Sequence, residues 1–417
     1  MPADQPTPNA TLLAAIPTVQ PKLFDVHSAD KTPIREFFHE HGFVVLSNVV
    51  SEEKRKNFVA QYAQNVLQQQ PWKTTFPFRV IDPDTQAELD VCTQRDKYVS
   101  VLTSAPLDRG TIKRYADSGP LHKGFGAPCD HDGFVSQAQN EIRQEEAVYE
   151  TASAILDNPH LWFDINRCIF KLPGEGEEEF IHLDTDPFKE YRPSKAVSGK
   201  VGITKMQFIC APKTHTEEFR ARFKSAYREH YPRAKASAPK FTLDPEKPDP
   251  ENIFAQCVAV DVPEGCMIFW SEDLFHGVRK SPIDSHIQIG MYLGFMPAVD
   301  RPEYLEVAGV SELEDRRRSY YEGLAPTLYP SLDEVHYYPK RFVNFHNILA
   351  SYARKIPKGH PAVSTRIMKS TGRSVVHLVQ TDTSSGRPRR LSTAIPYTPP
   401  PLTGLGRKLL GLDPWVV

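Results

Sequence analysis

Two stretches of the sequence decide the fold: EEEFIHLDTDPF at residues 177–188 and EGCMIFWSEDLFHGV at residues 264–278. In the first, a single residue separates His182 from Asp184, so on a β-strand both side chains leave the same face. In the second, His276 follows an apolar run and stands beside a glycine. Two imidazoles and one carboxylate are the ligand set that suits non-haem Fe(II) and leaves three coordination positions open. We therefore take His182, Asp184 and His276 as candidate metal ligands and catalytic residues.

The sequence around each motif indicates strands, which strengthens the interpretation of the His-x-Asp tripeptide as part of a metal site. Residues 164–184 have the pattern of a strand, a Pro-Gly turn and a second strand that ends at His182 and Asp184. Residues 258–278 have the pattern of a strand, a glycine turn and a strand before His276. An isolated His-x-Asp string has little specificity; its place at a strand end favours a metal site.

The rest of the chain predicts a mainly β core with flanking helices, arranged as a sandwich or small barrel. The period of the apolar residues predicts the helices 32–41, 52–69 and 139–156, the second of them capped by Ser51. Short β-type runs predict strands at 43–46, 166–171, 179–183, 201–210, 256–262, 266–270, 275–279 and 286–295.

Composition excludes several classes of protein. The 417 residues are 40% hydrophobic and 24% charged, and the net charge of −2 gives no global attraction to nucleic acid or to an anionic membrane. No apolar run approaches the 18 or so residues of a membrane span, and the N-terminus lacks a signal-peptide pattern. We expect an intracellular, cytoplasmic protein. The six cysteines form no CxxC pair, so we expect reduced and mostly buried thiols.

The order His-x-Asp, a long insertion and then EGCMIFW…HGV resembles the phytanoyl-CoA dioxygenase-like family of Fe(II)/2-oxoglutarate-dependent oxygenases. Residues 37–59, FFHEHGFVVLSNVVSEEKRKNFV, also resemble that family's N-terminal element. The resemblance covers about residues 35–297. It implies a double-stranded β-helix (jelly-roll, cupin-like) core in which His182, Asp184 and His276 bind Fe(II).

Proline content, local pattern and charge set the expected domain organisation. We expect a proline-rich N-terminal arm at 1–30 and the double-stranded β-helix domain with flanking helices at 31–300. A helical C-terminal extension at 301–357 and a basic, proline-rich tail at 358–417 would follow. The tail carries nine Lys or Arg residues against two Asp residues, a pattern typical of a solvated segment. A docking arm for an acidic partner or for nucleic acid is the other interpretation of this charge.

The sequence departs from the family at the position of the co-substrate cation. The resemblance implies a basic residue on the last core strand that pairs with the distal carboxylate of 2-oxoglutarate, but SHIQIGMYLGF at 285–295 contains neither Arg nor Lys. The candidates are His286 on that strand and Lys205 on the strand GITKMQF, followed by Arg279 and Arg167. A guanidinium would match a carboxylate best, because its planar fork donates two parallel hydrogen bonds.

Other polar residues have competing interpretations. Asp186 is a substitute ligand or, more simply, a turn residue before Pro187. The glutamates at 175–179 are a cation site or a solvated loop, and we favour the loop. His131 lies in a second His-Asp string, CDHDGF, that has no strand context, so we assign it to a loop. Asn166, beside Arg167, is a candidate contact for the co-substrate.

The predicted activity is an Fe(II)- and 2-oxoglutarate-dependent dioxygenase. It would use dioxygen to oxidise, most simply to hydroxylate, a C–H bond of a small organic substrate, with release of succinate and CO2 and with ascorbate as a reductant. Two alternatives stay open: a jelly-roll binding or scaffold protein with a degenerate co-substrate site, and an oxygenase that acts on nucleic acid or protein. Sequence leaves the substrate and the oligomeric state undefined.

Overall fold

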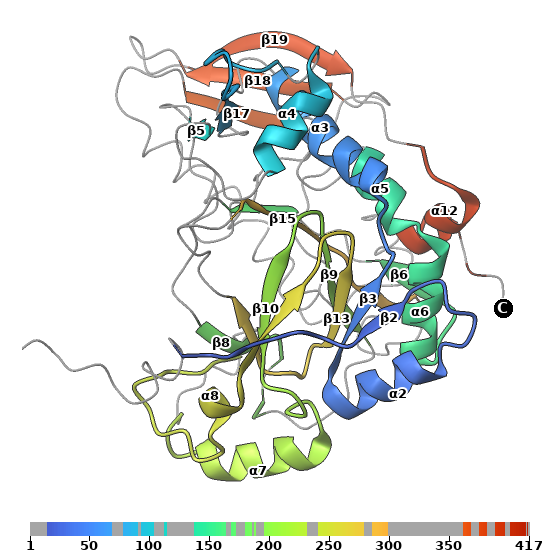
Figure 1. Ribbon diagram of the computed structural model, residues 1–417, viewed down its shortest axis with the longest axis vertical. Coiled ribbons are helices and arrows are strands. Elements are labelled where there is room, and N and C mark those ends of the chain that lie inside the picture. The colour runs from blue at the N-terminus through green and yellow to red at the C-terminus, as the bar shows by residue number, and fades with distance from the viewer. Residues whose placement is uncertain are drawn as a thin grey trace, which may run out of the picture.

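The computed structural model of the chain describes residues 15–68, 78–90, 93–103, 112–114, 137–163, 168–171, 180–185, 187–188, 196–231, 241–278, 286–298, 362–367, 375–381, 388–396, 401–413 and 415. Figure 1 shows the arrangement of the elements.

Eight strands form the core. In chain order they are β7 (Cys168–Lys171), β8 (Phe180–Leu183), β9 (Val197–Gly202), β10 (Met206–Cys210), β12 (Val258–Val262), β13 (Met267–Ser271), β14 (His276–Val278) and β15 (Gln288–Tyr292). One sheet contains the order β12-β10-β14-β8 and the other the order β13-β9-β15-β7, and all of these neighbours are antiparallel. The chain crosses between the sheets at every connection except that from β10 to β12. This strand order is that of a jelly roll, so the predicted fold class is confirmed.

Each core strand alternates between an inner and an outer face. On β13, Ile268 and Trp270 belong to the cluster between the two sheets, whereas Phe269 packs on the other side of its sheet. On β10, Phe208 points inward and Ile209 outward. The even-numbered residues of β9, β10, β13 and β15 therefore face the space between the sheets, as do those of β8 and β14.

Helices flank the two sheets (Figure 1). The apolar cluster on the outer side of the β13–β9 sheet also contains residues of α2 (Thr32–His41), α3 (Glu52–Gln68), α4 (Arg95–Thr103), α5 (Gln137–Arg143), α6 (Glu146–Leu156) and α12 (Gly404–Leu410). The sheet of β10 and β12 packs against α7 (Glu217–Tyr227) and α8 (Ile253–Gln256). The two short outer strands β4 (Phe78–Val80) and β5 (Ile112–Arg114) pair with each other.

Local chemistry sets the helix ends. The Thr216 hydroxyl caps α7 by accepting the Phe219 N–H at 3.2 Å, and the Ser51 hydroxyl accepts the Lys54 N–H at 3.3 Å at the start of α3. Gly42 ends α2 at φ +82°, and a Cβ there would lie 2.5 Å from Nδ1 of His215. Only glycine fits both the left-handed backbone and that close approach.

Two predicted elements are each divided in two. The helix predicted at 139–156 is α5 followed by α6, because Glu145 adopts an extended conformation between them. The strand predicted at 201–210 is the end of β9 followed by β10. Between them, the Thr204 hydroxyl donates to the carbonyl of Ile287 at 2.7 Å and holds a tight connection. Helix α7 was not predicted, although Phe219, Phe223 and Tyr227 recur at every fourth residue and form its buried face.

The described part of the N-terminal arm is extended, but it is also paired. β1 (Thr18–Val19) adds a parallel strand to β12, and β2 (Leu23–Asp25) adds one to β3 (Phe43–Ser47). Further strands complete the sheets: β11 (Phe241–Thr242) pairs with β8, and β6 (Leu161–Phe163) pairs with β16 (Phe295–Pro297).

The chain beyond residue 300 is described only in part. The predicted helical extension at 301–357 lies outside the described residues. Within the predicted tail, β17 (Ala362–Ile367), β18 (Val375–Thr381) and β19 (Pro388–Pro396) form an antiparallel sheet. Leu409 and Leu410 of α12 are buried in the core, and the Trp415 indole donates to the carbonyl of Leu161 at 3.0 Å. The described end of the tail is therefore packed against the domain rather than solvated.

None of the helices in the described part of the chain has the length and apolar composition that crossing a bilayer requires.

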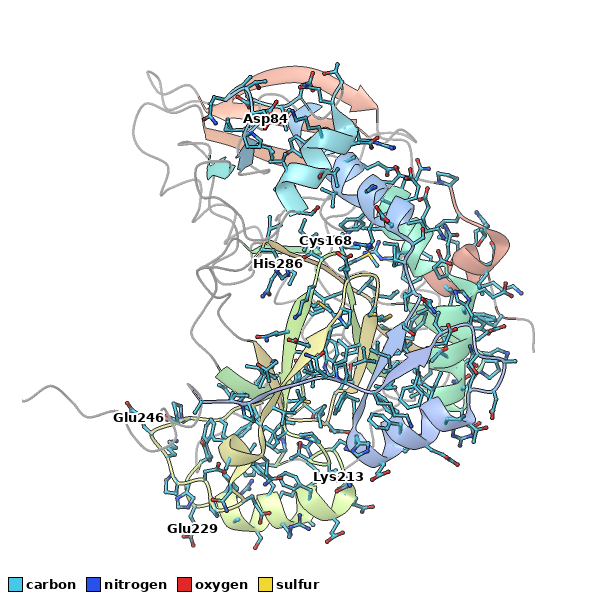
Figure 2. All side chains as sticks on the ribbon, in the orientation of Figure 1. Asp84, Cys168, Lys213, Glu229, Glu246 and His286 are labelled. Atoms are coloured by element: carbon cyan, nitrogen blue, oxygen red, sulfur yellow. The ribbon has the colours of Figure 1, made fainter. Side chains whose placement is uncertain are left out.

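The described cysteines Cys168, Cys210, Cys257 and Cys266 are buried and unoxidised, as expected; Cys168 is labelled in Figure 2. Cys92 and Cys129 lie outside the described residues. Burial raises the pKa of the Cys168 and Cys257 thiols to about 12.

Because the thiolate is the reactive form, we expect these four cysteines to resist alkylation in the folded protein and to react fully in denaturant. Peptide mapping by mass spectrometry after a brief iodoacetamide pulse measures this at each site. Rapid labelling of Cys168 or Cys257 in the folded protein would show that the sheet around it is open to solvent.

Candidate metal centre

The topology brings the three candidate ligands together from two separate parts of the sequence. β8 and β14 are antiparallel neighbours, and their register pairs His182 directly with His276. Both imidazoles leave the inner face of the sheet, where their ring centroids are 4.3 Å apart. Asp184 comes two residues after His182 and leaves the same side of the strand.

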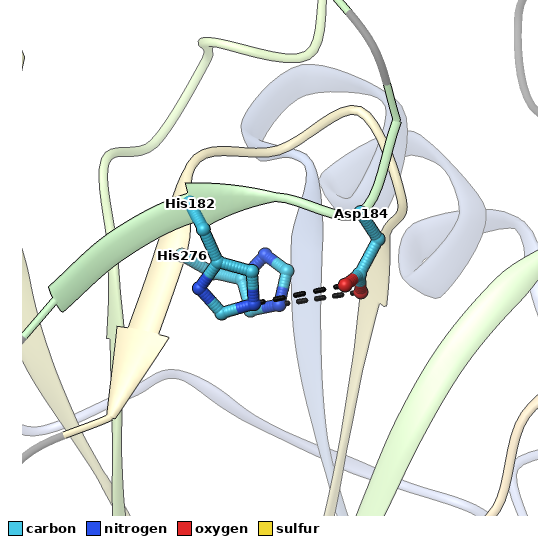
Figure 3. A group of neighbouring side chains, drawn as sticks. All are labelled: His182, Asp184 and His276. Carbon is cyan, nitrogen blue, oxygen red and sulfur yellow. Dashed lines mark ion pairs between the residues drawn. The ribbon is translucent and has the colours of Figure 1, made fainter. Parts of the chain in front are cut away.

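The three side chains converge on one point, as Figure 3 shows. Nε2 of His182 lies 3.6 Å from Oδ1 of Asp184, and Nε2 of His276 lies 3.4 Å from Oδ2. The ligand atoms all lie within 4.8 Å of one another. The two histidines are buried, and Asp184 is partly exposed, with 24% of its side-chain surface accessible.

This donor set fits a transition-metal ion. An ion that bonds at about 2.1 Å to two ligand atoms bridges a gap of up to roughly 4 Å between them. Both imidazole–carboxylate gaps are within that limit. The chemistry of the donors, two nitrogens and one carboxylate on one side of the ion, is that of non-haem Fe(II) sites with open positions.

A hydrogen bond fixes the tautomer of His276. Nδ1 lies 2.9 Å from the carbonyl oxygen of Leu274, which can only accept, so Nδ1 carries the proton and Nε2 keeps its lone pair. Nε2 is the atom that faces Asp184. The ring also stacks on Phe208 at 5.7 Å between centroids and contacts Trp270 at 5.4 Å. The imidazole is thus oriented to bind a metal through Nε2.

A buried polar network holds the segment that follows Asp184. The Thr185 hydroxyl donates to Oδ1 of Asp273 at 2.8 Å and accepts from the Arg220 guanidinium at 2.9 Å. Arg220 also donates to Asp273 at 3.2 Å, and both of these side chains are at most 5% exposed. Because Asp273 precedes β14 and Thr185 follows β8, the network ties the two ligand-bearing strands together behind the site.

The structure places two of the predicted co-substrate residues away from the three ligands. Lys205 is three residues before Phe208, so its side chain leaves the outer face of the sheet, and its ammonium pairs with Asp261 at 2.9 Å. His286 directs Nε2 to the carbonyl oxygen of Lys205 at 2.6 Å. His286 therefore contacts the backbone carbonyl of Lys205 and not its ammonium group. Arg279 and Arg167 lie outside the described residues.

Several further predictions fall outside the described part of the chain: Asp186, the glutamates at 175–179, His131 and Asn166. Aromatic residues surround the candidate ligands. Phe269 packs toward the helices, whereas Phe208, Trp270 and Tyr292 lie between the sheets near the candidate ligands.

Sequence reasoning missed two buried polar residues on the inner faces, Lys200 on β9 and Gln288 on β15. The alternation in VSGKVG at 197–202 could have revealed Lys200, because Val197 and Val201 mark one face of the strand and Lys200 stands on the other. The strand predicted from the sequence begins only at residue 201 and so excludes Lys200.

No family model matches the chain, and no curated protein matches it by sequence. Solved structures do match. EctD from S. alaskensis in its apoform is 16% identical with a TM-score of 0.37, covering 68% of this chain and 83% of that chain. The epimerase SnoN, solved with Fe3+, alpha ketoglutarate and nogalamycin RO, is 10% identical with a TM-score of 0.37, covering 64% and 84%. The alpha ketoglutarate-dependent carbocyclase SnoK is 14% identical with a TM-score of 0.37, covering 69% and 94%.

The resemblance drawn from the two motifs is confirmed at the level of the fold. It is the strand order of the two sheets that identifies this fold as a jelly roll.

Proposed function

We propose that the protein is an Fe(II)- and 2-oxoglutarate-dependent dioxygenase that oxidises a C–H bond of a small organic substrate. One observation carries the proposal: His182, Asp184 and His276 present their ligand atoms within 4.8 Å of one another on the inner face of a jelly roll, although 92 positions separate Asp184 from His276 in the sequence. The near-neutral net charge favours a small molecule over nucleic acid as the substrate.

The residues of the chain would hold and shield the reacting groups. His182, Asp184 and His276 would bind the ion on one side and leave its other side for co-substrate and dioxygen. When bound, the ferrous ion with 2-oxoglutarate would supply the oxidising chemistry, with release of succinate and CO2. Phe208 and Trp270 pack around His276 and exclude water from that side.

The test of this function is metal-dependent decarboxylation of the co-substrate. The purified protein, incubated with Fe(II), ascorbate, dioxygen and 2-oxo[1-14C]glutarate, is expected to release labelled CO2 and an equal amount of succinate even without its substrate, since such turnover can be uncoupled. Omitting Fe(II) or adding a chelator should stop the release. A protein that neither retains Fe(II) anaerobically nor releases succinate would be a binding or scaffold protein instead.

A further inference from the structure

Lys200 is a buried cation in an unusual place. Among the described residues, three Lys or Arg side chains are buried: Arg143, Lys200 and Arg220. Arg143 lies on α5 and Arg220 on α7, outside the two sheets. Lys200 stands in the middle of β9 with 7% of its surface exposed, paired in register with Ile268 and Tyr292. By the alternation of β9, its side chain points into the space between the sheets, the same space that His182 and His276 enter.

A glycine makes room for the end of this side chain. Gly290, on the neighbouring strand β15, faces the same space, and a Cβ built on it would lie 2.8 Å from Cε of Lys200. Any larger residue at position 290 would displace the end of the lysine. The ammonium lies 5.5 Å from the centroid of the Tyr292 ring, a cation–π distance. Gln288, buried on the same face of β15 two residues from Gly290, adds an amide to this region.

Aromatic contacts connect Lys200 to the candidate metal ligands. The Tyr292 ring contacts Trp270 with 6.5 Å between centroids, and Trp270 contacts His276 with 5.4 Å. The rings of Tyr292 and Trp270 thus connect Lys200 to His276 within the space between the sheets.

We infer that the ε-ammonium of Lys200, passing over Gly290, binds the carboxylate of 2-oxoglutarate that lies farther from the metal. The inference rests on the proposed function. A dicarboxylate that chelates the ion through its keto-acid end brings a second negative charge between the sheets, and a buried carboxylate needs a cation or strong donors. Lys200 supplies the cation from β9, and Gln288 supplies amide donors from the last core strand, where neither Arg nor Lys is present.

The experiment compares two keto acids. The Fe(II)-loaded protein is titrated anaerobically with 2-oxoglutarate and with 2-oxopentanoate, which has the same chain length and chelating end but no second carboxylate. The wild-type protein is expected to bind 2-oxoglutarate about 10- to 100-fold more tightly, the range for a hydrogen bond to a charged group. Lys200→Met should abolish this preference while the affinities for Fe(II) and for 2-oxopentanoate change by no more than about twofold.

Two further variants test whether the position of the Lys200 ammonium, and not only its charge, determines the preference. Lys205→Met removes an identical ammonium from the outer face and should leave the preference for the dicarboxylate intact. Gly290→Ala keeps the charge of Lys200 but displaces its end, so the preference should fall in this variant as well. A merely structural role of Lys200 would weaken the binding of both keto acids together.

The experiment distinguishes a failure of the proposed function from a failure of the Lys200 assignment. If the wild-type protein binds neither Fe(II) nor 2-oxoglutarate, the proposed function itself is wrong. If it binds both but Lys200→Met keeps the preference, or loses both keto acids equally, or if Lys205→Met loses the preference instead, only the assignment of Lys200 is overturned.

Discussion

Replacing Asp184 with alanine is expected to lower the affinity for Fe(II) by more than about 100-fold, because loss of a residue that merely supports a ligand already costs 10- to 100-fold. Succinate release should fall to the level without enzyme. Asp184 supplies the one negative charge of the donor set, and its two oxygens face the two imidazoles at 3.6 and 3.4 Å. Anaerobic titration with Fe(II) and the labelled-CO2 assay measure the two effects.

The fold should survive this change. Asp184 is partly exposed and belongs to no apolar cluster, so circular dichroism and the thermal unfolding midpoint should match those of the wild-type protein. Asp84→Ala is the matched control: its carboxylate is 79% exposed at the surface, far from the site in sequence (Figure 2). Full activity of a well-folded Asp184→Ala protein would contradict the metal site.

Replacing Arg220 with methionine is expected to destabilise the protein by about 3–5 kcal/mol, the usual cost of removing one partner from a buried ion pair. The change leaves the buried carboxylate of Asp273 without the guanidinium that faces it at 3.2 Å. Because Arg220 also donates to Thr185, next to Asp184, we expect metal affinity to fall 10- to 100-fold in addition. Denaturant unfolding and Fe(II) titration report these two quantities separately.

Arg222, on the same helix, is the control for Arg220. Its guanidinium pairs with Glu218 and Glu251 but is 49% exposed, so Arg222→Met should cost no more than about 1 kcal/mol and leave metal affinity unchanged. The double variant Arg220→Met/Asp273→Leu should recover much of the lost stability without recovering the metal affinity. Equal stability of the Arg220 and Arg222 variants would show that the buried pair does not hold the two strands.

Local pattern was enough to predict the core strands and the candidate ligands. His182, Asp184 and His276 stand at strand ends flanked by turn residues, and the core strands form near the predicted positions because short apolar runs lie between turn residues. The helix 32–41 was predicted with its observed bounds, since Gly42 ends it and a strand follows at once. Each of these signals lies within a few residues of the feature that it predicts.

The features that sequence did not reveal depend on register between distant segments. Lys200 becomes a candidate only when β9 lies between β13 and β15, so that Gly290 and Tyr292 stand beside it. The pairing of Lys205 with Asp261 likewise depends on the β10–β12 ladder. The Thr185–Asp273–Arg220 network joins residues 35 to 88 positions apart, and no local period encodes such a contact.

The packing of Trp415 determines how the C-terminal residues are held against the rest of the chain. Its ring stacks on Tyr149 and His160 and belongs to the same cluster as Met296 and Ala298, so distant segments of the chain meet at one place. The described residues that precede position 299 and those that follow position 400 are therefore held together by packing. A single proteolytic nick between these positions would leave α12 docked by Leu409, Leu410 and Trp415, and the two fragments would remain together as a noncovalent complex.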